Sequence, residues 1–142
     1  MKHTLKAVTA LALAILFAVC IAGCGNKKAS AGIWDTATYR KDTALGTGSI
    51  SVQVEVKADD RSVTFSIKTD KATLGEALLD EKLIAGEESE YGFYVKTVNG
   101  MLADYDIDQC YWAFYRNGEY MMTSVDATPI ADGEHYEFVH TK

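Results

Sequence analysis

Proline is nearly absent from this sequence, with one residue in 142, and no segment of the chain repeats another. The 48% of hydrophobic residues and 24% of charged residues are typical of an ordinary globular protein. The length fits one such domain with an additional segment at one end.

Positive charge is also scarce. The chain has 14 Lys and Arg against 20 Asp and Glu, a formal net charge of −6 at pH 7. Lys2 and Lys6 precede Cys24, whereas every acidic residue follows it, so the chain from Cys24 onward has 12 basic and 20 acidic residues, a balance of −8. Nucleic-acid binding is driven by clustered Lys and Arg. We therefore expect no nucleic-acid partner.

Motifs for catalysis and for transition metals are missing as well. The sequence has no nucleophile elbow, no phosphate-binding loop and no zinc-ligand spacing. His135 and His140 are too far apart for a metal-binding pair on a helix, and nothing near Cys110 supports its use as a nucleophile with either histidine. We predict that the protein is not an enzyme, binds no metal and needs no cofactor to fold.

Residues 104–108 carry carboxylates at alternate positions, as the start of an EF-hand calcium loop does. The sixth position of such a loop would be Gln109 instead of Gly, and the twelfth would be Tyr115 instead of Glu. The sharp turn and the bidentate ligand are therefore both missing, and we predict a solvated polar loop over residues 104–109.

The N-terminal segment is predicted to be a lipoprotein signal peptide over residues 1–23. Its apolar run, residues 7–22, is shorter than the roughly 20 residues that a spanning helix needs, which favours a signal peptide over a retained membrane anchor. The run ends in Ile21-Ala22-Gly23-Cys24, which resembles the lipobox of bacterial lipoproteins. The alternative is a cysteine that merely lies in a signal peptide, as Cys20 does. The lipobox predicts a lipid on Cys24 and attachment to the extracytoplasmic face of the bacterial cell membrane.

Cysteine is consequently too rare for a disulfide. Cys20 would leave with the signal peptide and Cys24 would carry the lipid, so Cys110 would remain as the single cysteine. We expect Cys110 to be a small buried hydrophobic residue rather than a reactive thiol.

Residues 24–48 are predicted to form the lipidated N-terminus and a flexible tether, because they are mostly small and polar. Trp34 and Tyr39 interrupt this composition. These two residues could dock on the folded domain or begin an additional strand. The folded domain itself is predicted over residues 49–142.

The first half of this domain contains the clearest periodic patterns. Alternation of apolar and polar residues predicts strands over residues 49–56 and 63–68, which form a hairpin. Thr73 and Glu76 form a capping box that begins a helix, and Gly86 is a plausible stop. The apolar face of the helix consists of Leu74, Ala77 and Leu78 and is broadened by Leu79 and Leu83.

The second half contains only strands and turns. Residues 93–98 and 134–140 are predicted strands, and between them the Asn117-Gly118 turn joins a strand from Tyr111 to an arm that runs to about Ser124. The order of two strands, one helix and several further strands fits an α+β domain of the β-grasp-like type, with one helix packed on a mixed sheet.

Aromatic residues with polar tips exceed what a small core requires, and such residues serve well in binding surfaces. They are Tyr91, Tyr94, Tyr105, Tyr111, Trp112, Tyr115, Tyr120 and Tyr136, and four of them lie in the hairpin over residues 111–120. Trp112 and Phe114 share one face of the strand, while Tyr111 and Tyr115 share the other. The alternation alone leaves open which pair is buried. The candidate ligand-binding residues are Tyr111, Trp112, Tyr115, Asn117, Tyr120 and Met122.

A set of short motifs extends in order over about residues 49–140. These motifs are Thr73-Leu74-Gly75-Glu76-Ala77-Leu78, Val98-Asn99-Gly100, Tyr111-Trp112 with Asn117-Gly118-Glu119, Ser124-Val125-Asp126, and Ile130 through Asp132-Gly133 to Tyr136-Glu137-Phe138. With them the chain resembles a family of bacterial lipoprotein domains of unknown function that is similar to the C-terminal β-domain of transcobalamin and intrinsic factor.

This resemblance implies a β-grasp-like fold of the soluble-ligand-binding type. In the eukaryotic carriers the domain covers one face of cobalamin, and a helical barrel domain holds the other face. The barrel is absent from this sequence, and Ser124 stands where family members often have Gly. Tight cobalamin binding therefore does not carry over with the resemblance.

We accordingly expect a lipid-anchored extracytoplasmic binding module that captures a soluble ligand, with cobalamin or another corrinoid as the candidate, for uptake through a membrane transporter. The alternative is a cell-surface interaction or adhesion module whose partner is a protein or a cell-wall polymer, without a small-molecule ligand.

Overall fold

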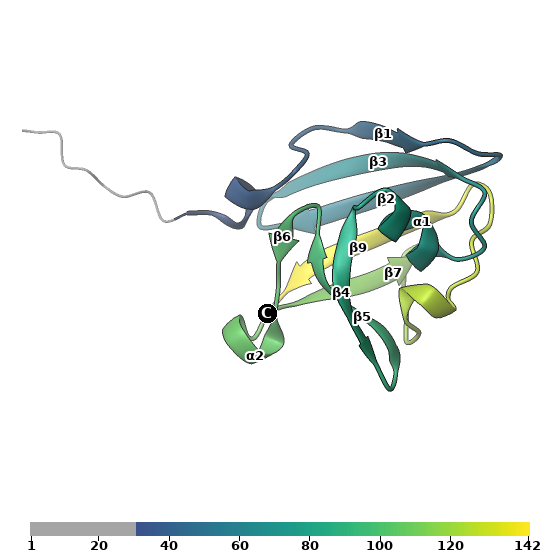
Figure 1. The fold of residues 1–142 in the computed structure, drawn as a ribbon. Helices are drawn as coiled ribbons and strands as arrows, with labels where there is room; N and C mark the ends of the chain where they lie inside the picture. The colour runs from purple at the N-terminus through teal and green to yellow at the C-terminus, as the bar shows by residue number, and fades with distance from the viewer. Residues whose placement is uncertain (1–30) are drawn as a thin grey trace, which may run out of the picture. The chain divides into compact units, whose positions relative to one another are not determined.

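The computed structural model describes residues 31–142, so the predicted signal peptide and Cys24 lie outside the described residues. The described chain is one compact unit that begins at Ala31 (Figure 1). Its elements in chain order are η1 (Ile33–Thr36), β1 (Thr43–Gly46), β2 (Ile50–Ala58), β3 (Arg61–Thr69), α1 (Leu74–Asp80), β4 (Ile84–Ser89), β5 (Gly92–Val98), β6 (Met101–Leu102), α2 (Tyr105–Asp108), β7 (Tyr111–Arg116), β8 (Glu119–Tyr120), η2 (Val125–Ala127) and β9 (His135–Thr141).

The strands form two sheets instead of the single mixed sheet expected from the sequence. The larger sheet has the order β1-β3-β2-β9-β7-β8, with parallel pairing of β1 to β3 and of β2 to β9, and the smaller has the order β4-β5-β6. Figure 1 shows the smaller sheet and α1 lying across one face of the larger sheet. The α+β class is confirmed. Strand β4 was not predicted, because most of its residues are exposed and show no apolar alternation.

The β2–β3 hairpin follows the alternation of the sequence. Apolar residues of both strands are buried, and their polar neighbours point to the opposite face of the sheet. The buried residues are Val52, Val54, Val56, Val63, Phe65 and Ile67. Together with Leu74 and Leu78 of α1 they form the centre of the core.

Helix α1 begins as its capping box predicts. The Thr73 side chain accepts a hydrogen bond from the Glu76 amide, and the Glu76 carboxylate accepts one from the Thr73 amide, both at 3.3 Å. The helix ends at Asp80, however, so the proposed stop at Gly86 is wrong. Gly86 lies at a bulge in β4, where the backbone of Tyr94 approaches so closely that a Cβ atom would not fit.

The β7–β8 hairpin turns at Asn117-Gly118 as predicted, with positive φ at both residues. Its second arm is much shorter than expected, because β8 ends at Tyr120, and β7 pairs along its whole length with β9 instead. The segment predicted as a polar loop contains the short helix α2. Cys110, next to it, is buried as expected, and burial raises the pKa of its thiol.

Residues 31–48 belong to the folded unit, in contrast to the predicted tether. Trp34 is buried, its Nε1 donates to the Ala58 carbonyl at 2.8 Å, and the Arg61 guanidinium lies 4.6 Å from its ring centroid. The buried Asn99 side chain accepts from the Tyr39 amide and donates to the Tyr39 carbonyl, each at 2.8 Å. Trp34 and Tyr39 therefore dock on the domain, and β1 adds an edge strand. No helix in this described unit is long and apolar enough to cross a membrane.

Candidate functional site

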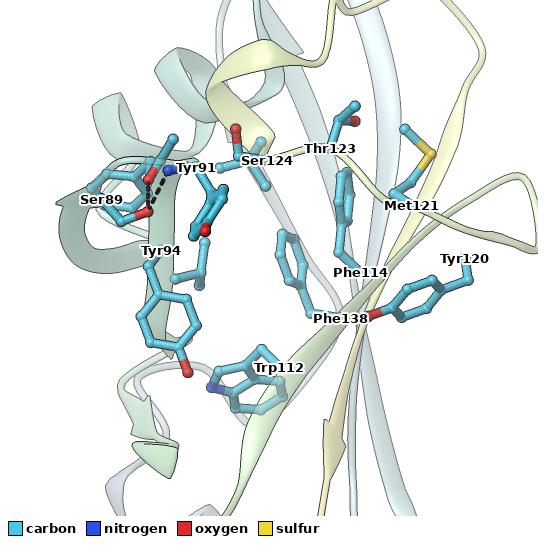
Figure 2. Close-up of a pocket in the computed structure, with 14 residues that line it drawn as sticks. Ser89, Tyr91, Tyr94, Trp112, Phe114, Tyr120, Met121, Thr123, Ser124 and Phe138 are labelled. Atoms are coloured by element: carbon cyan, nitrogen blue, oxygen red, sulfur yellow. Dashed lines mark hydrogen bonds between the residues drawn. The ribbon is translucent and has the colours of Figure 1, made fainter. Parts of the chain in front are cut away.

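An open pocket of about 240 Å³ lies where the smaller sheet meets strands β7 to β9. Figure 2 shows aromatic side chains from the two sheets facing one another across it. Its lining consists of Ser89, Tyr91, Gly92, Phe93, Tyr94, Val95, Trp112, Phe114, Tyr120, Met121, Thr123, Ser124, Val125 and Phe138. None of these residues is charged, so the pocket offers apolar contact and neutral hydrogen-bonding groups.

The wall from the larger sheet is built by neighbouring strands β7 and β9. Phe114 is opposite Phe138 in the β7–β9 register, and their rings stack with centroids 5.3 Å apart. Trp112 packs edge-on against the His140 ring at 5.3 Å. The structure thereby decides that Trp112 and Phe114 occupy the buried face of β7, and that Tyr111 and Tyr115 cover its outer face.

The opposite wall is held in place by contacts between β5 and the segment around η2. The Phe93 amide donates to the Asp126 carboxylate at 3.0 Å, and Gly92 packs directly against Ser124. Hydrogen bonds from the Ser124 side chain and the Phe93 amide lower the pKa of Asp126. Asp126 is therefore ionised at neutral pH and ties the tip of the β4–β5 hairpin to the loop that follows β8.

The aromatic side chains at the rim of the pocket are unusually exposed to solvent. Tyr91 at the tip of the β4–β5 hairpin is 85% exposed, and Tyr120 on β8 is 53% exposed. Met122, which follows the pocket residue Met121, is 90% exposed. Exposed apolar groups gathered at a concave site are typical of a binding surface.

Two of the six predicted ligand-binding residues, Trp112 and Tyr120, line the pocket. Tyr115 packs edge-on against Tyr120 with ring centroids 5.5 Å apart, and Tyr111 lies on the same outer face as Tyr115. Asn117 forms the hairpin turn, where its side chain accepts from the His135 amide at 3.0 Å. Met122 lies beside the pocket without lining it.

The six residues predicted from the sequence do not include the pocket residues of the β4–β5 hairpin, Tyr91, Phe93 and Tyr94. Residues 91–94 are rich in aromatic side chains, which could have pointed to a binding surface. They form a pocket only because β5 packs against β7. That contact joins residues from separate sheets, and no local pattern specifies it.

A second group of polar side chains lies on the outer face of the larger sheet, where β2 runs parallel to β9. Ligand-type atoms of Glu55, His135 and Glu137 all lie within 4.8 Å of one another. Nε2 of His135 is 3.4 Å from the nearer Glu55 oxygen and 3.7 Å from the nearer Glu137 oxygen. All three residues are half-buried.

Lys57 lies in the same group. Its Nζ is 2.8 Å from a Glu137 oxygen and 3.5 Å from a Glu55 oxygen. The hydrogen bond to Glu137 and the charge of Glu55 raise the pKa of Lys57, so the ammonium group stays charged at neutral pH. Of these residues the sequence pointed only to His135, and the parallel register that aligns Glu55 with Glu137 creates the cluster.

Fold and site together define a small α+β protein with a transcobalamin-like fold and a ligand-binding type of pocket. Haptocorrin in complex with Cbi matches it with a TM-score of 0.55 and 20% identity over 69% of this chain and 26% of haptocorrin, a likeness of fold alone. A Ruminococcus gnavus protein described as a candidate metal-binding protein matches it with a TM-score of 0.63 and 36% identity, over 66% of this chain and 98% of that protein. This chain belongs to the same family as the Ruminococcus gnavus protein. No protein-family model and no curated protein matches the chain.

Proposed function

We propose that this protein is an extracytoplasmic binding module, anchored through lipid on Cys24, that captures a soluble ligand for uptake instead of transforming it. The observation that carries the proposal is the uncharged aromatic pocket with its exposed tyrosine rim. A ligand with a flat ring system would lie over Tyr91 and Tyr120, and one of its side arms would enter the pocket. A corrinoid has this shape, and the transcobalamin-like fold supports it as the ligand class.

The test is equilibrium dialysis of residues 31–142 against cyanocobalamin and cobinamide, followed by the visible absorbance of the corrinoid. We expect saturable binding in the micromolar range or tighter. Tyr120→Ser should weaken binding about tenfold, because an aromatic contact contributes roughly 1–1.5 kcal/mol. Tyr105→Ser is the matched control, since Tyr105 is 58% exposed on α2 and does not line the pocket.

Absence of corrinoid binding at high micromolar concentration would reject this ligand class. Equal effects of the two tyrosine substitutions would instead place the bound corrinoid away from the pocket. In the first case the alternative of a surface protein or cell-wall polymer as partner would become the working hypothesis.

A second function is favoured by the cluster of Glu55, His135 and Glu137. One imidazole nitrogen and two carboxylates form a donor set that suits Zn²⁺ and leaves a coordination position open. A relative in the same family is described as a candidate metal-binding protein. Lys57 opposes this function, because its ammonium group already neutralises part of the carboxylate charge. A metal ion would have to displace Lys57 from Glu137.

The competition between Lys57 and a metal ion gives a direct test by isothermal titration with Zn²⁺. Lys57→Ala is expected to tighten Zn²⁺ binding by roughly tenfold, because a hydrogen bond between charged groups contributes about 1.5–3 kcal/mol. Glu137→Gln should abolish binding, while Glu88→Gln, the same charge change on the exposed strand β4, should leave it unchanged. If Zn²⁺ bound to neither the original protein nor the Lys57→Ala variant, this second function would be rejected.

A further inference from the structure

The indole N–H of Trp112 is a buried hydrogen-bond donor that the fold leaves without an acceptor. Trp112 is 7% exposed. Its Nε1 is buried and has no hydrogen-bond partner among residues 31–142. Buried donors in proteins are almost always paired, because an unpaired one loses its bond to water without compensation. Since residues 31–142 offer it no hydrogen-bond acceptor, this N–H is available to an acceptor on a bound molecule.

Trp34 provides the comparison within the same molecule. Its indole is buried to a similar degree, and its Nε1 donates to the Ala58 carbonyl at 2.8 Å. The fold thus supplies a protein acceptor to the tryptophan that lies away from the pocket. It supplies none to the tryptophan that forms the pocket wall.

A second neutral donor lies at the same end of the pocket. Figure 2 shows the Trp112 nitrogen on the edge of the indole that is nearest to the Tyr94 hydroxyl, and no hydrogen bond joins the two groups. Burial, reinforced by the charge of Asp104, raises the pKa of Tyr94. The hydroxyl is therefore protonated at neutral pH and able to donate.

The size and charge of the pocket restrict what these donors can hold. A volume of about 240 Å³ is below the roughly 300–1,000 Å³ of sites that enclose whole ligands, so the pocket takes one group of a larger molecule. No lining residue carries a positive charge that would compensate a buried carboxylate. A neutral acceptor is thereby favoured over an anionic one.

We infer that this end of the pocket is a subsite for a neutral carbonyl group, such as a carboxamide, whose oxygen accepts from Trp112 Nε1–H and from the Tyr94 hydroxyl. The apolar part attached to the carbonyl packs against Phe114 and Phe138. The inference rests on the proposed function, because it names the ligand group that the same pocket takes. A corrinoid satisfies it through one of its amide side arms, with the ring over the exposed rim.

The subsite can be tested with small probes, independently of the full ligand. The experiment uses ¹⁵N-labelled protein that consists of residues 31–142. The NMR signals of its two indole N–H groups are followed while benzamide, benzoate or toluene is added at millimolar concentration. Benzamide is expected to move the Trp112 signal downfield in a saturable way, and the Trp34 signal should stay in place as the internal control. Benzoate and toluene should bind more weakly, because one is anionic and the other has no acceptor.

Trp112→Phe removes the donor and retains an aromatic ring, so it separates hydrogen bonding from packing. We expect this variant to lose about fivefold to tenfold in benzamide affinity and to bind toluene as the original protein does. Benzamide and toluene binding equally well, an unchanged benzamide affinity in Trp112→Phe, or no binding of any probe would each overturn the inference. Benzamide binding without corrinoid binding would leave the carbonyl subsite standing and reject the corrinoid as its ligand.

Discussion

A protein that starts at Ser49 is expected to lose most or all of the stability of a protein that starts at Ala31. The shorter chain lacks Trp34, and truncating a buried tryptophan alone costs roughly 3–5 kcal/mol. It also loses strand β1 and leaves the buried Asn99 side chain without its two hydrogen bonds to Tyr39. Since small domains are stable by about 5–15 kcal/mol, this loss is enough to unfold many of them.

Urea denaturation followed by circular dichroism would measure this effect. Trp34→Phe in the longer protein is the useful intermediate, because it retains an aromatic ring while it removes the hydrogen bond to Ala58 and part of the buried volume. It should be destabilised by about 1–3 kcal/mol. Equal denaturation midpoints for the proteins that start at Ala31 and Ser49 would show that residues 31–48 are a tether after all.

Gly92→Ala is expected to disrupt the pocket and to cost roughly 2–4 kcal/mol of stability. Gly92 has a φ of +101°, and a Cβ atom there would clash with the Ser124 Oγ and lie 3.0 Å from the Asp126 Oδ1. Both the unfavourable backbone conformation and the steric clash contribute to the cost. Relieving the clash moves the β4–β5 hairpin away from Ser124, so ligand binding should fall together with stability.

Gly118→Ala is the control for the cost of placing an alanine at positive φ without a steric clash. Gly118 also has positive φ, at +83°, but nothing lies within 4 Å of a Cβ atom at this position. It should cost about 1–2 kcal/mol and leave the affinity for benzamide and corrinoid unchanged. Thermal unfolding and the binding experiments on both variants provide the comparison. A Gly92→Ala variant that binds normally would show that this contact does not set the pocket.

The features that the sequence predicted correctly are those with a local cause. The capping box of Thr73 and Glu76 starts a helix because both groups lie within one turn of the same backbone amides. Asn117-Gly118 forms a turn because both residues tolerate positive φ. Alternating apolar residues placed β2 and β3 correctly, because successive side chains of a strand point to opposite faces.

The predictions that failed concern segments whose structure depends on distant partners. Strand β4 is exposed over most of its length and forms because β5 pairs with it. The tether fails as a description of residues 31–48 because Trp34, whose docking the sequence left open, is buried through contacts with Ala58 and Arg61, which are far along the chain. Neither segment carries a local signal that outweighs its polar composition.

The candidate sites divide in the same way. The gathering of aromatic residues at the β7 hairpin was predictable, since Trp112 and Tyr120 belong to one local motif. The placement of Tyr91 and Tyr94 opposite Trp112, and of Glu55 beside His135 and Glu137, was visible only once the chain was folded. The physical reason is that turns, caps and strand faces arise from interactions between near neighbours, whereas packing between sheets and parallel strand pairing join residues that the chain keeps far apart.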